Sequence, residues 1–410
     1  MNGSQYEAIW ACLSSIQCCH KSTVDLIWGP PGTGKTKTLG TLLYALLKMN
    51  HRTLVCAPTN VAVKEVASRV LSMVRESFDR NSEALFCALG DMVLFGNHER
   101  LKVGADIEDI YLDYRVKHLM MCFAPLTGWR CCFSSMIDLL ENCVSHYHIF
   151  IENELRKDQE QVSDNNFNKT KDNSTSHCSE TEKVHKTFLE FVRERFLSVA
   201  VQLRDCISVL CTHVARSYIL DHNFEDLVCL IHKVSSFEAL LFQSNIVSEV
   251  LEKLFSPPEH LHNSCESSVG VEYLLYKSRT DCLSSLRTLK GSLDELSLPN
   301  SMNKESIREF CLQTSSLIFS TASSSFKLHS VVMEPLKVLV IDEAAQLKEC
   351  ESIIPLLLPN VEHAVLVGDE CQLPAMVASN VCTCYFIFNF QYSCFLHLHL
   401  LKLRKFFIAN

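Results

Sequence analysis

The stretch Gly29-Pro30-Pro31-Gly32-Thr33-Gly34-Lys35-Thr36 (GPPGTGKT) decides the fold expected of this 410-residue chain. It follows the apolar run VDLIW and opens a predicted helix from Lys35 to Met49, the context that the pattern G-x-x-x-x-G-K-[ST] requires. Glycines allow the backbone N–H groups of such a loop to point inward at phosphates, and the helix N-terminus adds partial positive charge. The stretch therefore predicts a phosphate-binding loop, in which Lys35 would reach the β- and γ-phosphates and Thr36 would offer its hydroxyl to Mg²⁺.

Two carboxylates follow a second apolar run. Residues 337–341 (KVLVI) read as a strand, and Asp342 and Glu343 come directly after it. Ligands of open α/β sheets bind at the carboxyl ends of the strands, so this pair would lie near the phosphate loop. Asp342 would hold Mg²⁺, through water or directly, and Glu343 would orient and deprotonate the attacking water. The alternative is a pair of acids that only caps the next helix.

A third polar segment, Gly368-Asp369-Glu370-Cys371-Gln372-Leu373-Pro374-Ala375, follows the apolar run HAVLVG. Gln372 has a neutral side chain that can contact both a γ-phosphate and a neighbouring loop, so it could report the state of the nucleotide. By itself the segment would be an ordinary surface turn.

Strands and helices alternate in two regions, from about Ser22 to Val74 and from about Ser315 to Ala378, which predicts a buried parallel sheet shared by both. The region between them differs. Residues 152–186 are almost without apolar side chains and predict a disordered loop. Apolar residues then recur at spacings of three and four, which predicts helices with one buried face each. These are Phe188, Val192, Phe196, Val199, Leu203, Ile207, Leu210 and Val214, and later Leu283, Leu286, Leu289, Leu293 and Leu296.

Composition excludes a mainly disordered or collagen-like chain, because 47% of the residues are hydrophobic and only 12 are glycine. The formal net charge of −9 argues against indiscriminate binding of polyanions, although a local basic groove remains compatible with it. The apolar stretch from Tyr385 to Leu401 is interrupted by polar residues, so a membrane span is disfavoured.

Five motifs occur in a fixed order: GPPGTGKT, APTNVAV, FSTASSS, VLVIDEAAQ and GDECQLPA. Together they resemble the first motor lobe of superfamily 1 helicases, in the branch of senataxin and the nonsense-mediated-decay helicase. The resemblance implies an α/β P-loop NTPase with a RecA-like parallel sheet flanked by helices, formed by residues 1–95 and 311–380. A mainly helical insertion would occupy residues 96–310, and residues 381–410 would form an atypical apolar tail.

The same resemblance implies roles for individual residues. Gln5 matches the glutamine that reads the adenine ring, and Ala57-Pro58-Thr59-Asn60 matches the motif that contacts nucleic-acid phosphates. Ser320 to Ser325 resembles a second segment near the strand, and Gln346 closes the acidic motif. The expected nucleotide-binding residues are Gln5, Gly29, Pro30, Pro31, Gly32, Thr33, Gly34, Lys35, Thr36 and Lys37, and the expected nucleic-acid contacts are Pro58, Thr59 and Asn60. Gln5 could instead be a solvated terminal side chain, Thr59 or Asn60 a helix N-cap, and the serines an ordinary loop.

A complete motor of this family has a second lobe that supplies an arginine to the transferring phosphoryl group. No match to that lobe follows Asn380, so we expect an ATP-dependent RNA or DNA helicase-type motor domain that is truncated and weak alone. Loss of the arginine costs on the order of 10³ to 10⁵ in rate. ATP and Mg²⁺ are the expected cofactors, single-stranded RNA or DNA the expected partner, and the insertion a possible surface for proteins. A P-loop switch or protein-remodelling module and a non-catalytic interaction fragment are the alternatives. The family likeness suggests the nucleus, and otherwise the cytoplasm.

Overall fold

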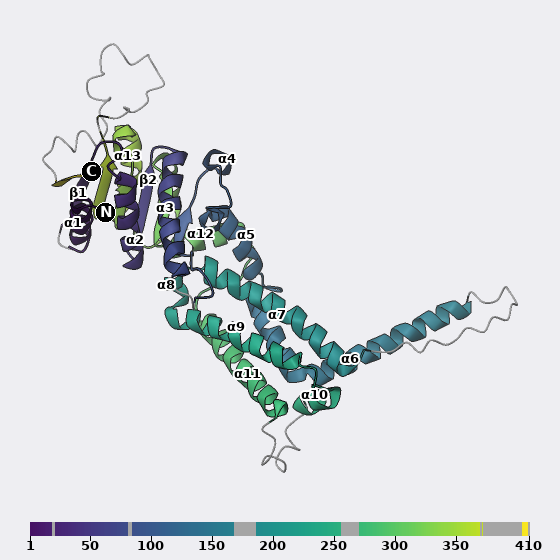
Figure 1. Cartoon of the computed structure of the whole chain (residues 1–410). Helices are drawn as coiled ribbons and strands as arrows, with labels where there is room; N and C mark the ends of the chain where they lie inside the picture. The colour runs from purple at the N-terminus through teal and green to yellow at the C-terminus, as the bar shows by residue number, and fades with distance from the viewer. Residues whose placement is uncertain are drawn as a thin grey trace. The chain divides into compact units, whose positions relative to one another are not determined.

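The computed structural model describes residues 1–18, 21–80, 84–167, 186–255, 270–369, 371 and 404–408 (Figure 1). Contacts between residues divide the chain into two compact units. Unit 1 comprises residues 1–124, 208–221 and 299–410, and unit 2 comprises residues 125–207 and 222–298.

A single sheet organises unit 1. Within the described residues it contains seven parallel strands in the order β3-β4-β2-β5-β6-β1-β7. The strands are β1 (Thr23–Trp28), β2 (Thr53–Ala57), β3 (Met92–Leu94), β4 (Leu317–Thr321), β5 (Val338–Ile341), β6 (His363–Gly368) and β7 (Arg404–Phe407). The predicted RecA-like parallel sheet flanked by helices is confirmed.

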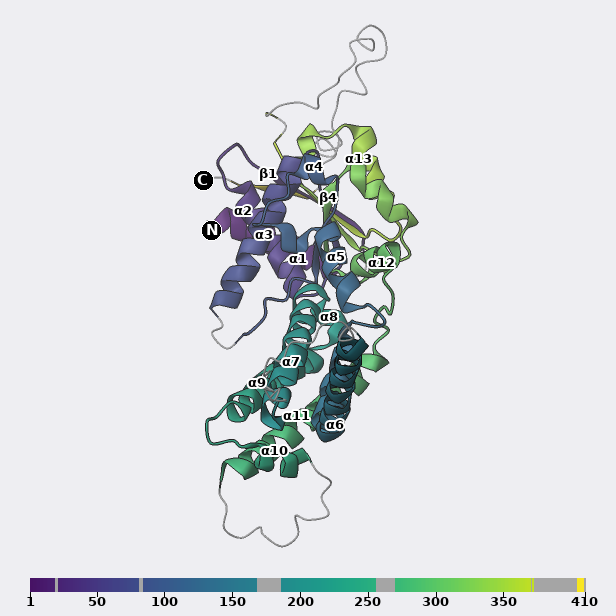
Figure 2. The ribbon, with the colours of Figure 1, turned by 90° about the vertical axis from the view of Figure 1, so that its right-hand side faces the viewer.

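Helices cover both faces of this sheet, which explains why the strand sequences are apolar throughout. Figure 2 shows α1 (Gly3–Ile16), α2 (Lys35–Lys48) and α3 (Asn60–Asp79) on one side and α12 (Lys304–Thr314) and α13 (Glu349–Leu356) on the other. Alternate strand residues such as Val55, Phe319 and Val340 pack with α1, α2 and α3 in one buried core. The described residues of unit 1 also form the helices α4 (His98–Leu101), α5 (Leu112–Cys122) and α8 (Arg216–Ile219), and the 3₁₀ turns η1 (Glu108–Ile110), η3 (Ser323–Ser330) and η4 (Ala344–Gln346).

Unit 2 is helical in its described residues. It contains α6 (Trp129–Phe167), most of α7 (Phe188–His213) and α9 (Asp221–Leu241), α10 (Ser248–Phe255) and α11 (Val271–Glu295). The predicted apolar stripe that begins at Phe188 is buried along its whole length, from Phe188 to Val214. In the later stripe Leu286, Leu289 and Leu293 are buried. These side chains therefore form packing faces.

The structure differs from the sequence-based boundaries in two places. Residues 152–167 continue helix α6 and do not form the expected loop, whereas residues 168–185 lie outside the described residues. Residues 96–124, 208–221 and 299–310 belong to the sheet-containing unit and not to the helical one. Of the expected tail, residues 404–407 form strand β7, and residues 381–403 lie outside the described part of the chain.

Candidate functional site

The carboxyl edge of the sheet brings the two strongest sequence motifs to the same place. The phosphate loop leaves β1 at Gly29, and Asp342 and Glu343 leave β5. Strand β6 is the only strand between β1 and β5. With neighbouring strands about 4.8 Å apart, β1 and β5 are separated by roughly 10 Å, a gap that the phosphates of a nucleotide and a metal ion can bridge.

The loop itself depends on glycine at two kinds of position. Gly32 and Gly34 both have φ of +82°, a backbone conformation that other residues rarely adopt. Gly29 is constrained by space instead, because a Cβ there would lie 2.7 Å from the carbonyl oxygen of Ile408 and 2.8 Å from Thr33 Oγ1. The Thr33 hydroxyl donates to the Pro30 carbonyl at 2.8 Å and closes the turn. Contacts within the chain itself therefore define the shape of the loop.

Lys35 lies folded over this loop. Its Nζ donates to the carbonyl oxygens of Gly29 at 2.7 Å and Pro30 at 3.3 Å, and the residue is 8% exposed. Charged acceptors form stronger hydrogen bonds with an ammonium group than neutral carbonyls do. Phosphate oxygens in the loop would thus compete well for this buried cation.

Gln5 connects helix α1 to the end of the loop. Its Nε2 donates to the Thr33 carbonyl at 2.8 Å, and its Oε1 accepts from the Asn2 backbone N–H at 3.1 Å as half of a capping box. Gln5 is 7% exposed, so the solvated alternative is wrong. Its amide lies beside the loop, and whether it also reads a base stays a prediction.

The acidic pair occupies two different environments. Asp342 is 5% exposed, and burial, followed by the nearby charges of Glu343 and Glu65, raises its pKa to about 7, while Lys35 opposes this shift. Glu343 has a left-handed backbone (φ 49°) and accepts a hydrogen bond from Gln346 Nε2 at 3.0 Å. Gln346 therefore fixes the direction of the Glu343 carboxylate, and Lys35 lies close enough to Asp342 to influence its charge.

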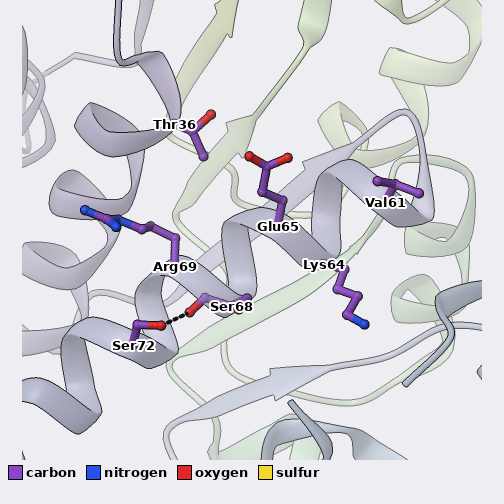
Figure 3. A pocket seen from close by; sticks show the side chains of 7 residues that line it. All are labelled: Thr36, Val61, Lys64, Glu65, Ser68, Arg69 and Ser72. Atoms are coloured by element: carbon purple, nitrogen blue, oxygen red, sulfur yellow. Dashed lines mark hydrogen bonds between the residues drawn. The ribbon is translucent and has the colours of Figure 1, made fainter. Parts of the chain in front are cut away.

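Sequence reasoning missed Glu65. Figure 3 shows its carboxylate and the Thr36 side chain facing the same open space beside helix α3. This cavity has a volume of about 460 Å³ and is lined by Thr36, Val61, Lys64, Glu65, Ser68, Arg69 and Ser72. No motif names Glu65; only its place on the first turns of α3, next to the phosphate-loop helix, could have indicated it. The cavity extends the candidate site along α3.

The expected nucleic-acid segments lie on the same carboxyl edge, farther along the sheet. Thr59 is exposed and caps α3, with its Oγ1 accepting from Ala62 N–H at 3.2 Å. The Ala322 backbone N–H donates to Ala57 O at 3.0 Å, which joins this segment to the serine-rich turn that begins η3. The helix-cap role of Thr59 is thus present, and a hydroxyl that accepts one hydrogen bond can still donate another to a phosphate.

Gln372 and Glu370 lie outside the described residues. Asp369, which precedes them, is 4% exposed and accepts from the Cys371 backbone N–H at 3.0 Å. In the part of the chain that the structure describes, no group of three or more His, Cys, Asp or Glu side chains is placed to hold a metal. No helix within those same residues has the length and apolar character needed to cross a membrane.

Comparison with known proteins agrees with this geometry. The family model described as "AAA domain" matches residues 1–380. Among curated relatives, a Regulator of nonsense transcripts 1 homolog from Neurospora crassa is 42% identical over 102 residues, which is 23% of this chain and 9% of the relative. The ATP-dependent helicase upf1 of Schizosaccharomyces pombe is 43% identical over 77 residues (17% and 8%), and the Probable helicase senataxin of Homo sapiens is 34% identical over 114 residues (24% and 4%). The matches thus span less than a tenth of each relative's length. Since the family model spans most of the chain, this protein belongs to the AAA domain family, and the relatives to which it is similar include proteins named as a regulator of nonsense transcripts and as helicases.

Proposed function

We propose that this chain binds ATP with Mg²⁺ and hydrolyses it as part of a helicase-type motor that acts on single-stranded RNA or DNA. The observation that carries the proposal is the meeting of Lys35 and Thr36 with Asp342 and Glu343 at one sheet edge, although these pairs are some three hundred residues apart in the sequence. The names of the relatives, which include an ATP-dependent helicase, support the same activity.

The donor set fits a magnesium ion, a hard cation that prefers oxygen ligands. The Thr36 hydroxyl and the Asp342 carboxylate would hold it, and when bound it would supply positive charge to the phosphate oxygens. Lys35 would exchange its carbonyl partners for phosphate oxygens. Glu343, held by Gln346, would orient a water molecule and accept its proton.

A single-turnover measurement of ATP hydrolysis tests the proposal, with the wild-type chain and the variants Lys35→Ala and Glu343→Gln. Lys35→Ala should abolish nucleotide binding, and Glu343→Gln should retain binding but lose hydrolysis. Lys48→Ala is the control, since Lys48 lies at the far end of the same helix. Unchanged nucleotide binding by Lys35→Ala would refute the proposal.

The nucleic-acid part has its own test. Photocrosslinking of single-stranded RNA, followed by peptide mapping, should label the segment that contains Pro58, Thr59 and Asn60. A chain that binds and hydrolyses ATP but gives no label there would be a switch or remodelling ATPase and not a nucleic-acid motor.

A further inference from the structure

Strand β7 borders the phosphate-loop strand although it lies beyond the residues that the family model matches. The match ends at residue 380, and β7 comprises Arg404–Phe407. It pairs in parallel with β1, so that β1 lies between β6 and β7 and is not the edge of the sheet. Residues outside the shared family region thus contact the strand from which the phosphate loop emerges.

The pairing continues to the last residue before the loop. Ile408 N–H donates to the Trp28 carbonyl at 2.8 Å, directly before Gly29. Ile408 is fully buried and belongs to the core cluster that holds α1, α2 and the sheet together. The ring centroids of Trp28 and Phe407 are 4.7 Å apart, which adds a side-chain contact to the backbone pairing.

Gly29 and Ile408 approach each other so closely that no side chain fits between them. A Cβ on Gly29 would lie 2.7 Å from the Ile408 carbonyl oxygen and 3.4 Å from the Ile408 Cβ. The Gly29 carbonyl is the nearer of the two acceptors of Lys35 Nζ, at 2.7 Å. A shift of Ile408 would therefore move the Gly29 peptide unit, whose carbonyl accepts the hydrogen bond from the lysine that would bind phosphate.

The other end of the loop is held from a different side. Gln5 on α1 donates to the Thr33 carbonyl, and α1 itself contacts β7. Between Ile408 and Gln5 the loop is fixed at its start and at its end. A binding loop that is already ordered loses less conformational freedom when the ligand arrives.

We propose that Ile408 is a positioning residue for the nucleotide site: with β7 it forms the wall against which the start of the phosphate loop is fixed, and the affinity for a nucleoside triphosphate depends on it. This inference rests on the proposed function for its ligand. Its structural half, the ordering of the loop by β7, does not need the ligand.

The test uses the full chain with Ile408→Ala and Ile408→Asp, and Ile408→Val as the conservative variant. Met92→Ala is the matched control, because Met92 is also buried in the same core cluster but lies on β3 at the opposite edge of the sheet. Amide hydrogen exchange of residues 26–35 is measured without nucleotide, and affinity is measured with a fluorescent ATP analogue and Mg²⁺.

Both Ile408→Ala and Ile408→Asp should speed exchange of the loop amides and weaken binding, by about tenfold for Ile408→Asp. Ile408→Val should keep the exchange rate and the affinity close to those of the wild type. Met92→Ala should lower thermal stability, while its affinity stays within about twofold of the wild type. Wild-type exchange in Ile408→Ala would overturn the proposal even if Ile408→Asp does not fold, and so would an equal loss of affinity in Met92→Ala.

Failure of the proposed function would look different. A wild-type chain that does not bind the analogue would refute nucleotide binding and with it the affinity claim, whereas the exchange measurement would still decide whether β7 orders the loop.

Discussion

Replacing Arg115 with methionine should lower the free energy of unfolding of unit 1 by more than the loss of an exposed ion pair would. Arg115 is fully buried at the opposite end of the strands from the candidate site. Its guanidinium donates to the carbonyl oxygens of Met92 (2.6 Å), Gly90 (2.9 Å) and His213 (2.8 Å), and to the Ser315 hydroxyl at 3.2 Å. It therefore joins β3, the end of α7 and the start of β4 within unit 1.

The magnitude follows from the acceptors that remain. Three carbonyls would each lose a hydrogen bond from a cation, and an unsatisfied buried group costs about 1–3 kcal/mol. Part of this loss is offset because the desolvation cost of the buried cation disappears with it. We expect a loss of about 4 kcal/mol, or roughly 10 °C in melting temperature for a unit of this size.

Hydrogen exchange of the β3 and β4 amides, together with urea unfolding, measures the free energy of this unit in Arg115→Met. Arg75→Met is the control: Arg75 also bonds a carbonyl and pairs with Asp109 at 2.8 Å, but both side chains are about one-third exposed. Its loss should cost no more than about 1 kcal/mol. If Arg115→Met were no less stable than Arg75→Met, the reasoning from buried hydrogen bonds would be wrong.

Three further outcomes are expected. Gln346→Leu should slow single-turnover hydrolysis about tenfold to a hundredfold with little change in nucleotide affinity, since it removes the hydrogen bond that directs Glu343; quench-flow and equilibrium binding separate the two effects. Gly34→Ala should weaken nucleotide binding and lower the melting temperature, because its φ of +82° and the Gln5 Nε2 atom only 2.7 Å from the added Cβ both oppose a side chain; calorimetric titration and thermal melts check this. Burial first, then the nearby charges of Arg115 and His118, lowers the pKa of His213 to about 3, whereas an unfolded histidine titrates near 6.5. The unfolded state then binds the extra proton, so stability falls as pH drops below about 6.5, by about 1.4 kcal/mol at pH 5.5. Urea unfolding at pH 7.5 and 5.5 should show this loss, and His213→Gln should remove that part of it.

The sheet was predictable where strands carry both apolar runs and flanking motifs. β1, β2, β4, β5 and β6 all coincide with runs that precede a turn or a motif. β3 has only three residues, Met92–Leu94, too few for any periodicity to register. β7 is the sequence RKFF in a segment with no motif beside it, and only its pairing with β1 identifies it as part of this sheet.

The polar stretch after residue 152 shows two principles in conflict. Low hydrophobicity predicts disorder, yet Glu, Leu, Arg, Lys and Gln are good helix formers. Arg156 pairs with Glu152 at 4.0 Å and Lys157 with Glu154 at 3.0 Å, spacings that stabilise a helix from its own surface. Helix propensity prevails as far as Phe167.

The residues of the candidate site also divide into those that the sequence identifies and those that it does not. The glycines, Lys35 and the acidic pair were identifiable because their chemistry demands particular residues in a fixed order. Glu65 and Ile408 were not, because only their positions in the folded chain single them out: Glu65 lines a cavity beside Thr36, and Ile408 lies against Gly29. Their residue types carry no signal until the chain is folded.

The left-handed backbone of Glu343 opposes the stability of the fold to the role proposed for its carboxylate. Glycine or asparagine adopts φ of 49° more readily than glutamate, whose strain in this region costs on the order of 1 kcal/mol. A selection for more thermostable variants should therefore recover Glu343→Gly, and under the role proposed for Glu343 that variant should have lost ATP hydrolysis. Such a selection would favour stability at the expense of the proposed activity unless ATP hydrolysis is measured in parallel.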